Sequence, residues 1–138
     1  RLSIAVSAVA ACEAVILETV KYVKERTAFG KAIADFQHTQ FKLAELEAEV
    51  TVMRVFIDRC AELLVKKELS TVEASKAKLL ATELQGKVTD QCVQMHGGYG
   101  YMWEYPVARA YADARVQRIY GGTSEVMKLI IGRDLLAD

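Results

Sequence analysis

Apolar residues recur along this chain at intervals of three or four positions, the spacing that lines one face of a helix. The first stripe runs through residues 2–23 and predicts a helix that ends near Arg26. A second uninterrupted stripe through residues 43–64 predicts another long helix with the apolar seam of a helix bundle. Because Gly30 and the stretch 31–35 break the pattern between them, we expect a loop there.

Cap and turn residues divide the second half of the chain into further helices. Ser70 and Glu73 have the spacing of a capping box, which predicts a third helix that ends at the glycine pair 97–98. Pro106 is accepted in a first helical turn because its missing amide hydrogen would lack a partner there anyway. It therefore predicts a short helix that continues to about residue 116.

A glycine pair separates this short helix from the last one. Gly121 and Gly122 form the break, and either Thr123 or Ser124 can cap the helix that follows. Glu125 in its first turn opposes the positive end of the helix dipole. The elements together predict an all-α fold of one domain.

Composition and charge exclude several function classes. An apolar fraction of 52% over 138 residues can fill one core and leaves little room for a second. Eighteen basic and eighteen acidic side chains cancel, so no broad positive surface is available for nucleic acid. The apolar run 4–12 ends at Glu13, short of the roughly 20 residues of a membrane span. We expect neither a nucleic-acid partner nor a membrane span.

Residues that form disulfides or bind metals are few. Cys12, Cys60 and Cys92 are odd in number and widely spaced, which favours free core thiols in a reducing compartment. His38 and His96 are the only histidines, and no Glu-x-x-His pair occurs. The sequence therefore predicts no disulfide and no metal site.

Two segments contain residues suited to an anionic, planar ligand. Segment 26–31 places two cations, an aromatic residue and a glycine just beyond a helix end. Its arginine can hold phosphate oxygens with two parallel hydrogen bonds, although such charges also simply complement the helix dipole. Segment 94–101 has glycines at three of four successive positions beside a glutamine and two tyrosines. A ligand could approach that backbone closely, and a plain helix-ending turn is the alternative.

Five motifs of this chain occur together, in this order and spacing, in one protein family. They are Arg26-x-x-Phe29-Gly30-Lys31, Gln37, Gln94-x-x-Gly97-Gly98-x-Gly100-Tyr101, Asp113-Ala114-Arg115 and Ile119-Tyr120-Gly121-Gly122-Thr123-Ser124-Glu125. The chain thereby resembles, over essentially its whole length, the carboxy-terminal domain of the acyl-CoA dehydrogenases. The resemblance implies an up-down four-helix bundle with a short extra helix. This bundle would join an amino-terminal helical domain and a middle β domain, within a homo-dimer or tetramer.

The resemblance also implies FAD as the cofactor, bound between subunits. Arg26 would contact the pyrophosphate, and Gln37 with the loop 94–98 would surround the adenosine half of a neighbour's flavin. Glycine loops and helix amino termini both expose backbone donors to an anionic cofactor. The cofactor-binding residues that the resemblance implies are Arg26, Phe29, Gln37, Gln94, Met95, His96, Gly97, Gly98, Thr123, Ser124 and Glu125.

The implied reaction is α,β-dehydrogenation of a fatty acyl-CoA. A carboxylate would take the α proton, the β hydrogen would leave as hydride to the flavin, and electrons would pass to an electron-transferring flavoprotein. The commonest family pattern has the glutamate base at position 121, where this chain has Gly121, which cannot take a proton. We therefore assign Gly121 and Gly122 as substrate contacts, and we do not assign Glu125 as the base.

Members of the long-chain and isovaleryl types carry the base elsewhere, immediately before an Arg-Leu pair. This chain begins with Arg1-Leu2 and not with Met, so we expect a piece of a longer enzyme with its base one residue upstream. Segments 103–106 and 120–123 look most like the long-chain type, which favours a straight-chain substrate. An isovaleryl-like or other branched substrate is the alternative.

The resemblance places the parent enzyme in the bacterial cytoplasm or the mitochondrial matrix. The isolated chain should have little affinity for FAD and no turnover. The alternative hypothesis is a non-catalytic module that only binds flavin or CoA, or holds subunits together.

Overall fold

The computed structural model describes residues 1–137 of the chain. This part contains five α-helices, two short 3-10 helices and one two-stranded hairpin. In chain order the elements are α1 (Leu2–Glu25), β1 (Thr27–Ala28), β2 (Lys31–Ala32), η1 (Ile33–Asp35), α2 (Gln37–Val65), α3 (Thr71–His96), η2 (Gly97–Tyr101), α4 (Pro106–Gln117) and α5 (Ser124–Leu135).

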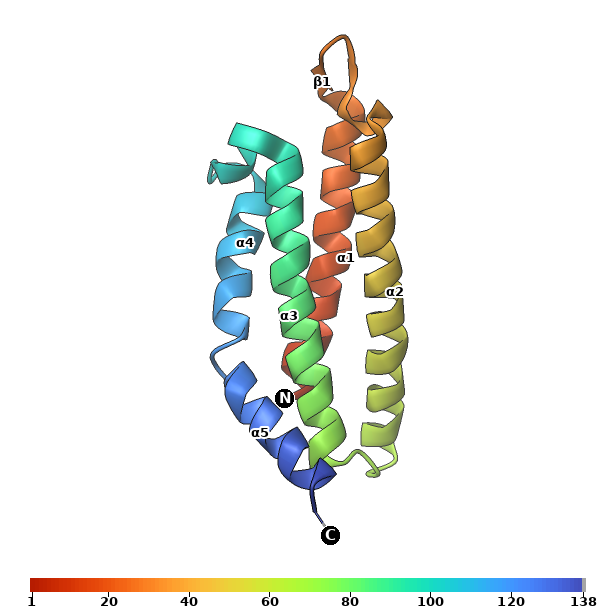
Figure 1. The fold of residues 1–138 in the computed structure, drawn as a ribbon, viewed down its shortest axis with the longest axis vertical. Helices are drawn as coiled ribbons and strands as arrows, with labels where there is room; N and C mark the ends of the chain where they lie inside the picture. The colour runs from red at the N-terminus through yellow and green to blue at the C-terminus, as the bar shows by residue number, and fades with distance from the viewer. Residues whose placement is uncertain (138) are drawn as a thin grey trace.

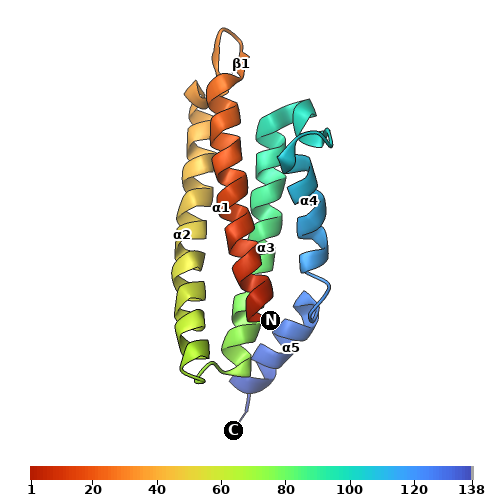
Figure 2. The same cartoon turned by 180° about the vertical axis from the view of Figure 1, so that it is seen from behind.

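The helices form the predicted up-down bundle. Helices α1, α2 and α3 run its whole length, and α4 and α5 follow one another along the fourth side (Figure 1). Viewed from behind, α1 lies between α2 and the α4–α5 side (Figure 2). The all-α fold with one short extra helix is therefore confirmed.

Helix α1 is the core helix of the bundle, and it packs most extensively against α3. Its small residues Ala5, Ala8 and Cys12 are completely buried, and they allow the two helices to approach closely. By length and composition alone α1 could cross a membrane, with a mean hydropathy of 1.8. A buried core helix of a bundle has the same composition, and here α2, α3 and α4 pack against α1.

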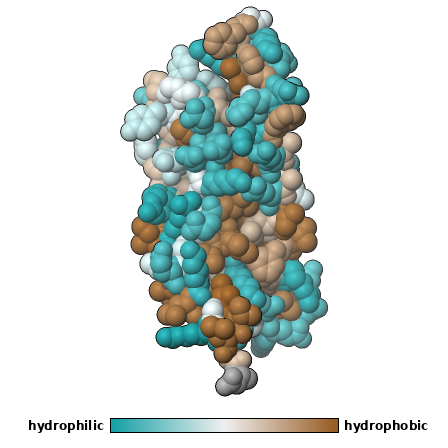
Figure 3. All heavy atoms as spheres, viewed as in Figure 1, coloured by the Kyte–Doolittle hydropathy of each residue, from teal (hydrophilic) through white to brown (hydrophobic). Residues whose placement is uncertain are grey.

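The apolar stripes of α2 and α3 are only partly inside. Leu46, Val50, Ile57 and Cys60 of α2 are buried as the spacing predicts. Leu80 of α3, by contrast, is about half exposed, whereas Ala77 and Ala81 beside it in the sequence are completely buried. Large apolar side chains of α2 and α3, among them Val52, Val55 and Leu80, are exposed at the surface. Apolar residues are brown in Figure 3.

All three cysteines are free and buried, as predicted. Burial raises the pKa of the Cys12 thiol to about 12 and that of Cys60 and Cys92 above the ordinary value. These side chains therefore stay protonated at neutral pH, and they act as small apolar residues of the core.

The cap of α3 is the predicted capping box. The Glu73 amide donates to the Ser70 hydroxyl over 3.0 Å, and the Glu73 carboxylate accepts from the Ser70 amide over 3.2 Å. At α5 the structure decides between the two predicted caps, because the Thr123 hydroxyl accepts from the Val126 amide over 3.3 Å.

The loop expected after α1 is a tight β-hairpin. Residues 27 and 28 pair with 32 and 31, and Phe29 and Gly30 form the two-residue turn. Both turn residues have positive φ, 53° at Phe29 and 80° at Gly30, as a type I′ turn requires. The apolar periodicity could not predict this hairpin, because each of its strands has only two residues, too few to show a repeating pattern.

Candidate functional site

A pocket of about 630 Å³ lies at the end of the bundle where α1 meets the loop that follows α3. The structure brings six of the predicted cofactor residues together in its wall: Arg26, Gln94, Met95, His96, Gly97 and Gly98. Tyr22, Ile33, Tyr99 and Met102 complete the lining. The pocket thus combines one cation, aromatic and apolar surface, and a glycine-rich backbone.

Glycines shape the loop that forms one wall of this pocket. Gly97 ends α3 with a φ of 61°, a conformation that side chains rarely adopt. A Cβ on Gly100 would lie 2.5 Å from the carbonyl oxygen of Val93, so only glycine lets the loop fold back on α3. A Cβ on Gly98 would meet nothing within 4 Å. The backbone at Gly98 is therefore open to a ligand.

His96 forms the floor between the pocket and the core. Its ring stacks on Tyr22 with centroids 4.1 Å apart, and its Nδ1 lies 2.8 Å from the carbonyl oxygen of Cys92. Because a carbonyl only accepts, Nδ1 carries the hydrogen and Nε2 is the acceptor of the neutral ring. Burial lowers the pKa of His96 below its ordinary value. The residue therefore fixes the loop as a neutral, packed ring.

Arg26 provides the positive charge of the pocket. Its guanidinium lies over the ring of Tyr99, 5.2 Å from the centroid, and the residue is exposed. No carboxylate within residues 1–137 comes within ion-pair distance of this side chain. Its hydrogen-bond donors are therefore available to an anionic ligand such as a phosphate.

Phe29 and Gln37 do not line this pocket. Phe29 is at the tip of the hairpin with 96% of its surface exposed, and its ring contacts Phe36 edge-on at 6.3 Å. Gln37 is exposed at the start of α2. If these two residues contact the same ligand as Arg26, that ligand extends out of the pocket over the hairpin.

Sequence reasoning missed Tyr22, although a signal for it exists. Tyr22 precedes Arg26 by four positions, and side chains four apart lie on the same face of a helix. Its hydroxyl donates to the carbonyl oxygen of His96 over 3.1 Å and so joins α1 to the glycine loop. No local spacing pointed to Ile33 or Met102, which reach the pocket only through the hairpin and the fold of η2.

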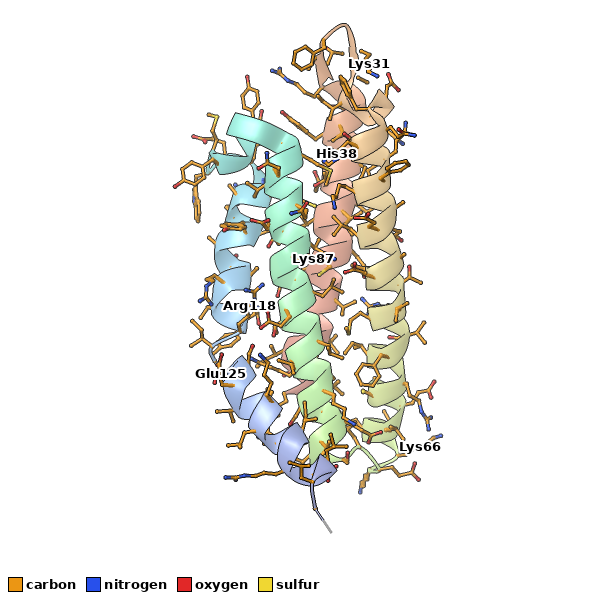
Figure 4. The ribbon with its side chains drawn as sticks, viewed as in Figure 1. Lys31, His38, Lys66, Lys87, Arg118 and Glu125 are labelled. Atoms are coloured by element: carbon orange, nitrogen blue, oxygen red, sulfur yellow. The ribbon has the colours of Figure 1, made fainter. Side chains whose placement is uncertain are left out.

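The other predicted residues lie in the turn between α4 and α5 and in the first turn of α5. Gly121 and Gly122 have φ values of 62° and 101°. The Ser124 hydroxyl donates to the Glu83 carboxylate over 2.7 Å. Hydrogen bonds from its own backbone amide and then from Thr123 lower the pKa of exposed Glu125. Figure 4 marks Arg118 and Glu125 on either side of this turn.

The structure does not bring the turn and the pocket together. The turn lies against Ile4 near the start of α1, whereas the pocket is lined by Tyr22 near its end. At 1.5 Å per residue these positions are about 27 Å apart along the helix. The two predicted groups would therefore contact different parts of a long ligand, or two different ligand molecules.

The first turn of α1 fills the space beside Gly121. A Cβ on Gly121 would overlap Cδ1 of Ile4, so a side chain at this position would require the end of the Ile4 side chain to move. The α4–α5 turn and the beginning of α1 thus form one contact. No group of three or more potential metal ligands occurs among residues 1–137.

Comparison with known proteins gives one consistent result. The model of the family "Acyl-CoA dehydrogenase, C-terminal domain" matches residues 1–136. The mitochondrial long-chain specific acyl-CoA dehydrogenase of Rattus norvegicus is 54% identical over 138 residues, which are 100% of this chain and 32% of that protein.

Solved structures give the same result. An acyl-CoA dehydrogenase of Geobacillus kaustophilus superposes with a TM-score of 0.96 at 45% identity, over 99% of this chain and 36% of that one. A glutaryl-CoA dehydrogenase of Mycobacterium smegmatis, solved in complex with FADH2, has a TM-score of 0.95 at 25% identity, over 100% of this chain and 36% of that one. The chain thus spans about a third of the length of these relatives.

Proposed function

Since the chain belongs to the acyl-CoA dehydrogenase family, as its carboxy-terminal domain, we propose that it supplies FAD contacts and subunit contacts to a longer enzyme. That enzyme would catalyse α,β-dehydrogenation of a fatty acyl-CoA. The observation that carries the proposal is the pocket at Arg26. It combines an open glycine backbone with a guanidinium that no carboxylate of residues 1–137 pairs with.

The residues of this pocket fit the adenosine and pyrophosphate portion of FAD. Arg26 would hold the pyrophosphate, and the open backbone at Gly98 would allow close approach of the nucleotide. Tyr99 and Met102 add apolar surface beside them. Because Phe29 and Gln37 lie outside the pocket, the ligand would extend over the hairpin, as expected of a cofactor shared with a neighbouring subunit.

Thr123, Ser124 and Glu125 would contact a flavin at the other site, about 27 Å away along α1. The distance supports contacts to two cofactors, one of which is shared with a neighbour, rather than to one cofactor within the chain. Bound FAD accepts hydride at its isoalloxazine ring and supplies the redox chemistry. A subunit lacking this domain would therefore lose contacts to both cofactors.

The catalytic base would come from the beginning of α1. Ile4 points at Gly121, and the residue one position before Arg1 lies four positions before Ile4. In a helix continued by one turn, these two side chains share a face. A carboxylate there would reach the region that a residue at 121 faces, which supports a base on α1.

Glu125 is unsuited to be the base. It is exposed, and hydrogen bonds to its carboxylate lower its pKa, whereas a base that removes an α proton works best in a dry site with a raised pKa. Gly121 and Gly122 would instead supply backbone contacts to the substrate.

We further propose that the substrate is a straight, long acyl chain and that an electron-transferring flavoprotein accepts the electrons. The 54% identity to the rat long-chain enzyme supports this substrate class. The exposed apolar groove between α2 and α3, lined by Val52, Met53 and Leu80, supports a homo-dimer or tetramer. The relatives are compatible with a mitochondrial matrix or bacterial cytoplasmic enzyme.

Anaerobic titration of the purified full-length protein tests this proposal. Bound flavin should be bleached by acyl-CoA thioesters, most completely by long straight chains. Bound flavin that never bleaches at any chain length would favour the alternative, a non-catalytic binding module, for which Gly121 is the supporting feature. The isolated 138-residue chain should purify without stoichiometric flavin.

A further inference from the structure

Lys78 is a completely buried lysine in the first half of α3. Its Nζ donates a hydrogen bond of 2.7 Å to the carbonyl oxygen of Gly122, in the turn between α4 and α5. Within residues 1–137 no carboxylate comes within ion-pair distance of this nitrogen. Burying an amine with one carbonyl partner opposes folding, so its presence here calls for another reason.

A second residue of α3 holds both ends of this turn. Glu83 accepts from the Ser124 hydroxyl over 2.7 Å, just after the turn, and pairs with Arg118 over 3.3 Å, just before it. The Ser124 amide also donates to the carbonyl oxygen of Arg118 over 3.1 Å. Lys78 therefore fixes the middle of a turn whose ends are already tied to α3.

The hydrogen bond of Lys78 determines which way one peptide group points. The carbonyl of Gly122 and the amide of Thr123 belong to the same planar trans peptide, in which C=O and N–H point in opposite directions. With the carbonyl held toward Lys78, the Thr123 amide points away from it. Within the described chain no acceptor bonds this amide, so it is an available donor.

Two glycines make this orientation dependent on an external constraint. Gly121 and Gly122 both have positive φ and allow a wide range of backbone conformations, so the turn itself does not hold the peptide plane. Burial lowers the pKa of Lys78, while Glu83 and Glu125 nearby act in the opposite direction. Because Lys78 is completely buried, water does not compete for the hydrogen bond between its Nζ and the Gly122 carbonyl oxygen. This bond therefore holds the peptide group in one orientation.

We propose that Lys78 is a positioning residue that orients the Thr123 amide as a hydrogen-bond donor to the bound flavin. This inference rests on the proposed function, in which Thr123 is one of the flavin contacts. Because its side chain is completely buried, Lys78 itself would contact neither cofactor nor substrate. Its removal should therefore weaken flavin retention and leave the pocket at Arg26 unchanged.

The test uses the full-length holoenzyme with Lys78→Met, which keeps the length of the side chain and removes the donor. Lys76→Met is the matched control, because Lys76 lies on the same helix and is exposed. FAD release, followed by flavin fluorescence, should be at least tenfold faster in Lys78→Met and within twofold of wild type in Lys76→Met. The KM for acyl-CoA should change by less than threefold.

Amide hydrogen exchange distinguishes positioning from a merely structural role. In the wild type, bound FAD should protect the segment 119–124 from exchange, and this protection should be lost in Lys78→Met while α3 stays protected. If Lys78→Met does not fold, Lys78→Gln takes its place under the same criteria, because its shorter side chain cannot span the same distance.

Two results would overturn the inference separately from the proposed function. If the wild type binds FAD and a folded Lys78 variant releases it no more than twofold faster, only the positioning role fails. Faster release with unchanged protection of 119–124 also rejects the positioning role. If the wild-type full-length protein binds no FAD, the proposed function fails and the role of Lys78 fails with it.

Discussion

Ile4 of α1 occupies the space that a side chain at position 121 would need. Its Cδ1 would overlap a Cβ on Gly121, whose φ of 62° is itself unfavourable for any other residue. The position at which the commonest family members carry a base thus faces the helix that would carry the base here. The positive φ favours glycine, whereas a side chain at this position would require only the flexible end of Ile4 to move.

Gly121→Ala should therefore destabilise the 138-residue chain by about 2 kcal/mol, through backbone strain and overlap with Ile4. Ile4→Val deletes Cδ1, so the same alanine should cost about 1 kcal/mol less in that background. Urea unfolding of the wild type, both single variants and the double variant measures this coupling.

Gly98→Ala is the control for this cycle, since a Cβ there meets nothing within 4 Å and the residue does not have positive φ. It should change stability by less than about 0.5 kcal/mol. If Gly121→Ala costs the same in the wild-type and the Ile4→Val backgrounds, the contact between α1 and the turn is not energetically important.

Phe29 should show a conflict between stability and function. It has positive φ and is 96% exposed, so its ring adds strain to the hairpin without filling the core. Phe29→Asn creates the Asn-Gly pair that type I′ turns prefer and should stabilise the chain by about 1 kcal/mol. In the full-length enzyme the same change should accelerate FAD release, because the aromatic contact is lost.

Lys67→Asn separates these two effects. Lys67 also has positive φ, 61°, in the connection between α2 and α3, far from the hairpin in the sequence. This variant should gain similar stability and keep wild-type FAD release. Unchanged release in Phe29→Asn would remove Phe29 from the cofactor contacts.

His96 should make the chain sensitive to mild acid. Burial lowers its pKa in the folded state, so just below pH 6.5 the unfolded chain binds a proton that the folded chain does not. Stability should therefore fall as the pH decreases through 6.5 toward the lowered pKa. Carboxylates such as Glu13, whose pKa is lowered by Arg54, act only below about pH 4.5.

Thermal unfolding of the 138-residue chain between about pH 7 and pH 5 measures this slope. His96→Phe keeps an aromatic ring beside Tyr22 and should flatten it, whereas His38→Gln, at an exposed histidine, should retain it. An unchanged slope in His96→Phe would assign the acid sensitivity to other groups.

Local rules were sufficient to predict the helices and their caps. The stripe of α2 and the capping box at Ser70 and Glu73 depend only on residues within two turns of one another, so they can be read from spacing. The hairpin at Phe29 could not be predicted, because its strands are too short to have a period.

The site was only partly predictable for a related reason. The loop 94–98 stood out through its glycines, and Arg26 stood out through its neighbours in the motif. Lys78 looks like any surface lysine in the sequence, and its burial depends on contacts with a turn 44 positions away. Long-range packing, rather than spacing, determines such a residue.

Gly121 cannot accept a proton, and a residue on α1 would act as the catalytic base instead. The most direct test replaces the residue that immediately precedes Arg1 in the full-length protein by glutamine and follows flavin absorbance as acyl-CoA is added without oxygen. We expect this residue to be a glutamate, and we expect the variant to retain FAD and bind substrate without bleaching of the flavin. Bleaching at the wild-type rate, or a native residue that cannot accept a proton, would contradict this assignment.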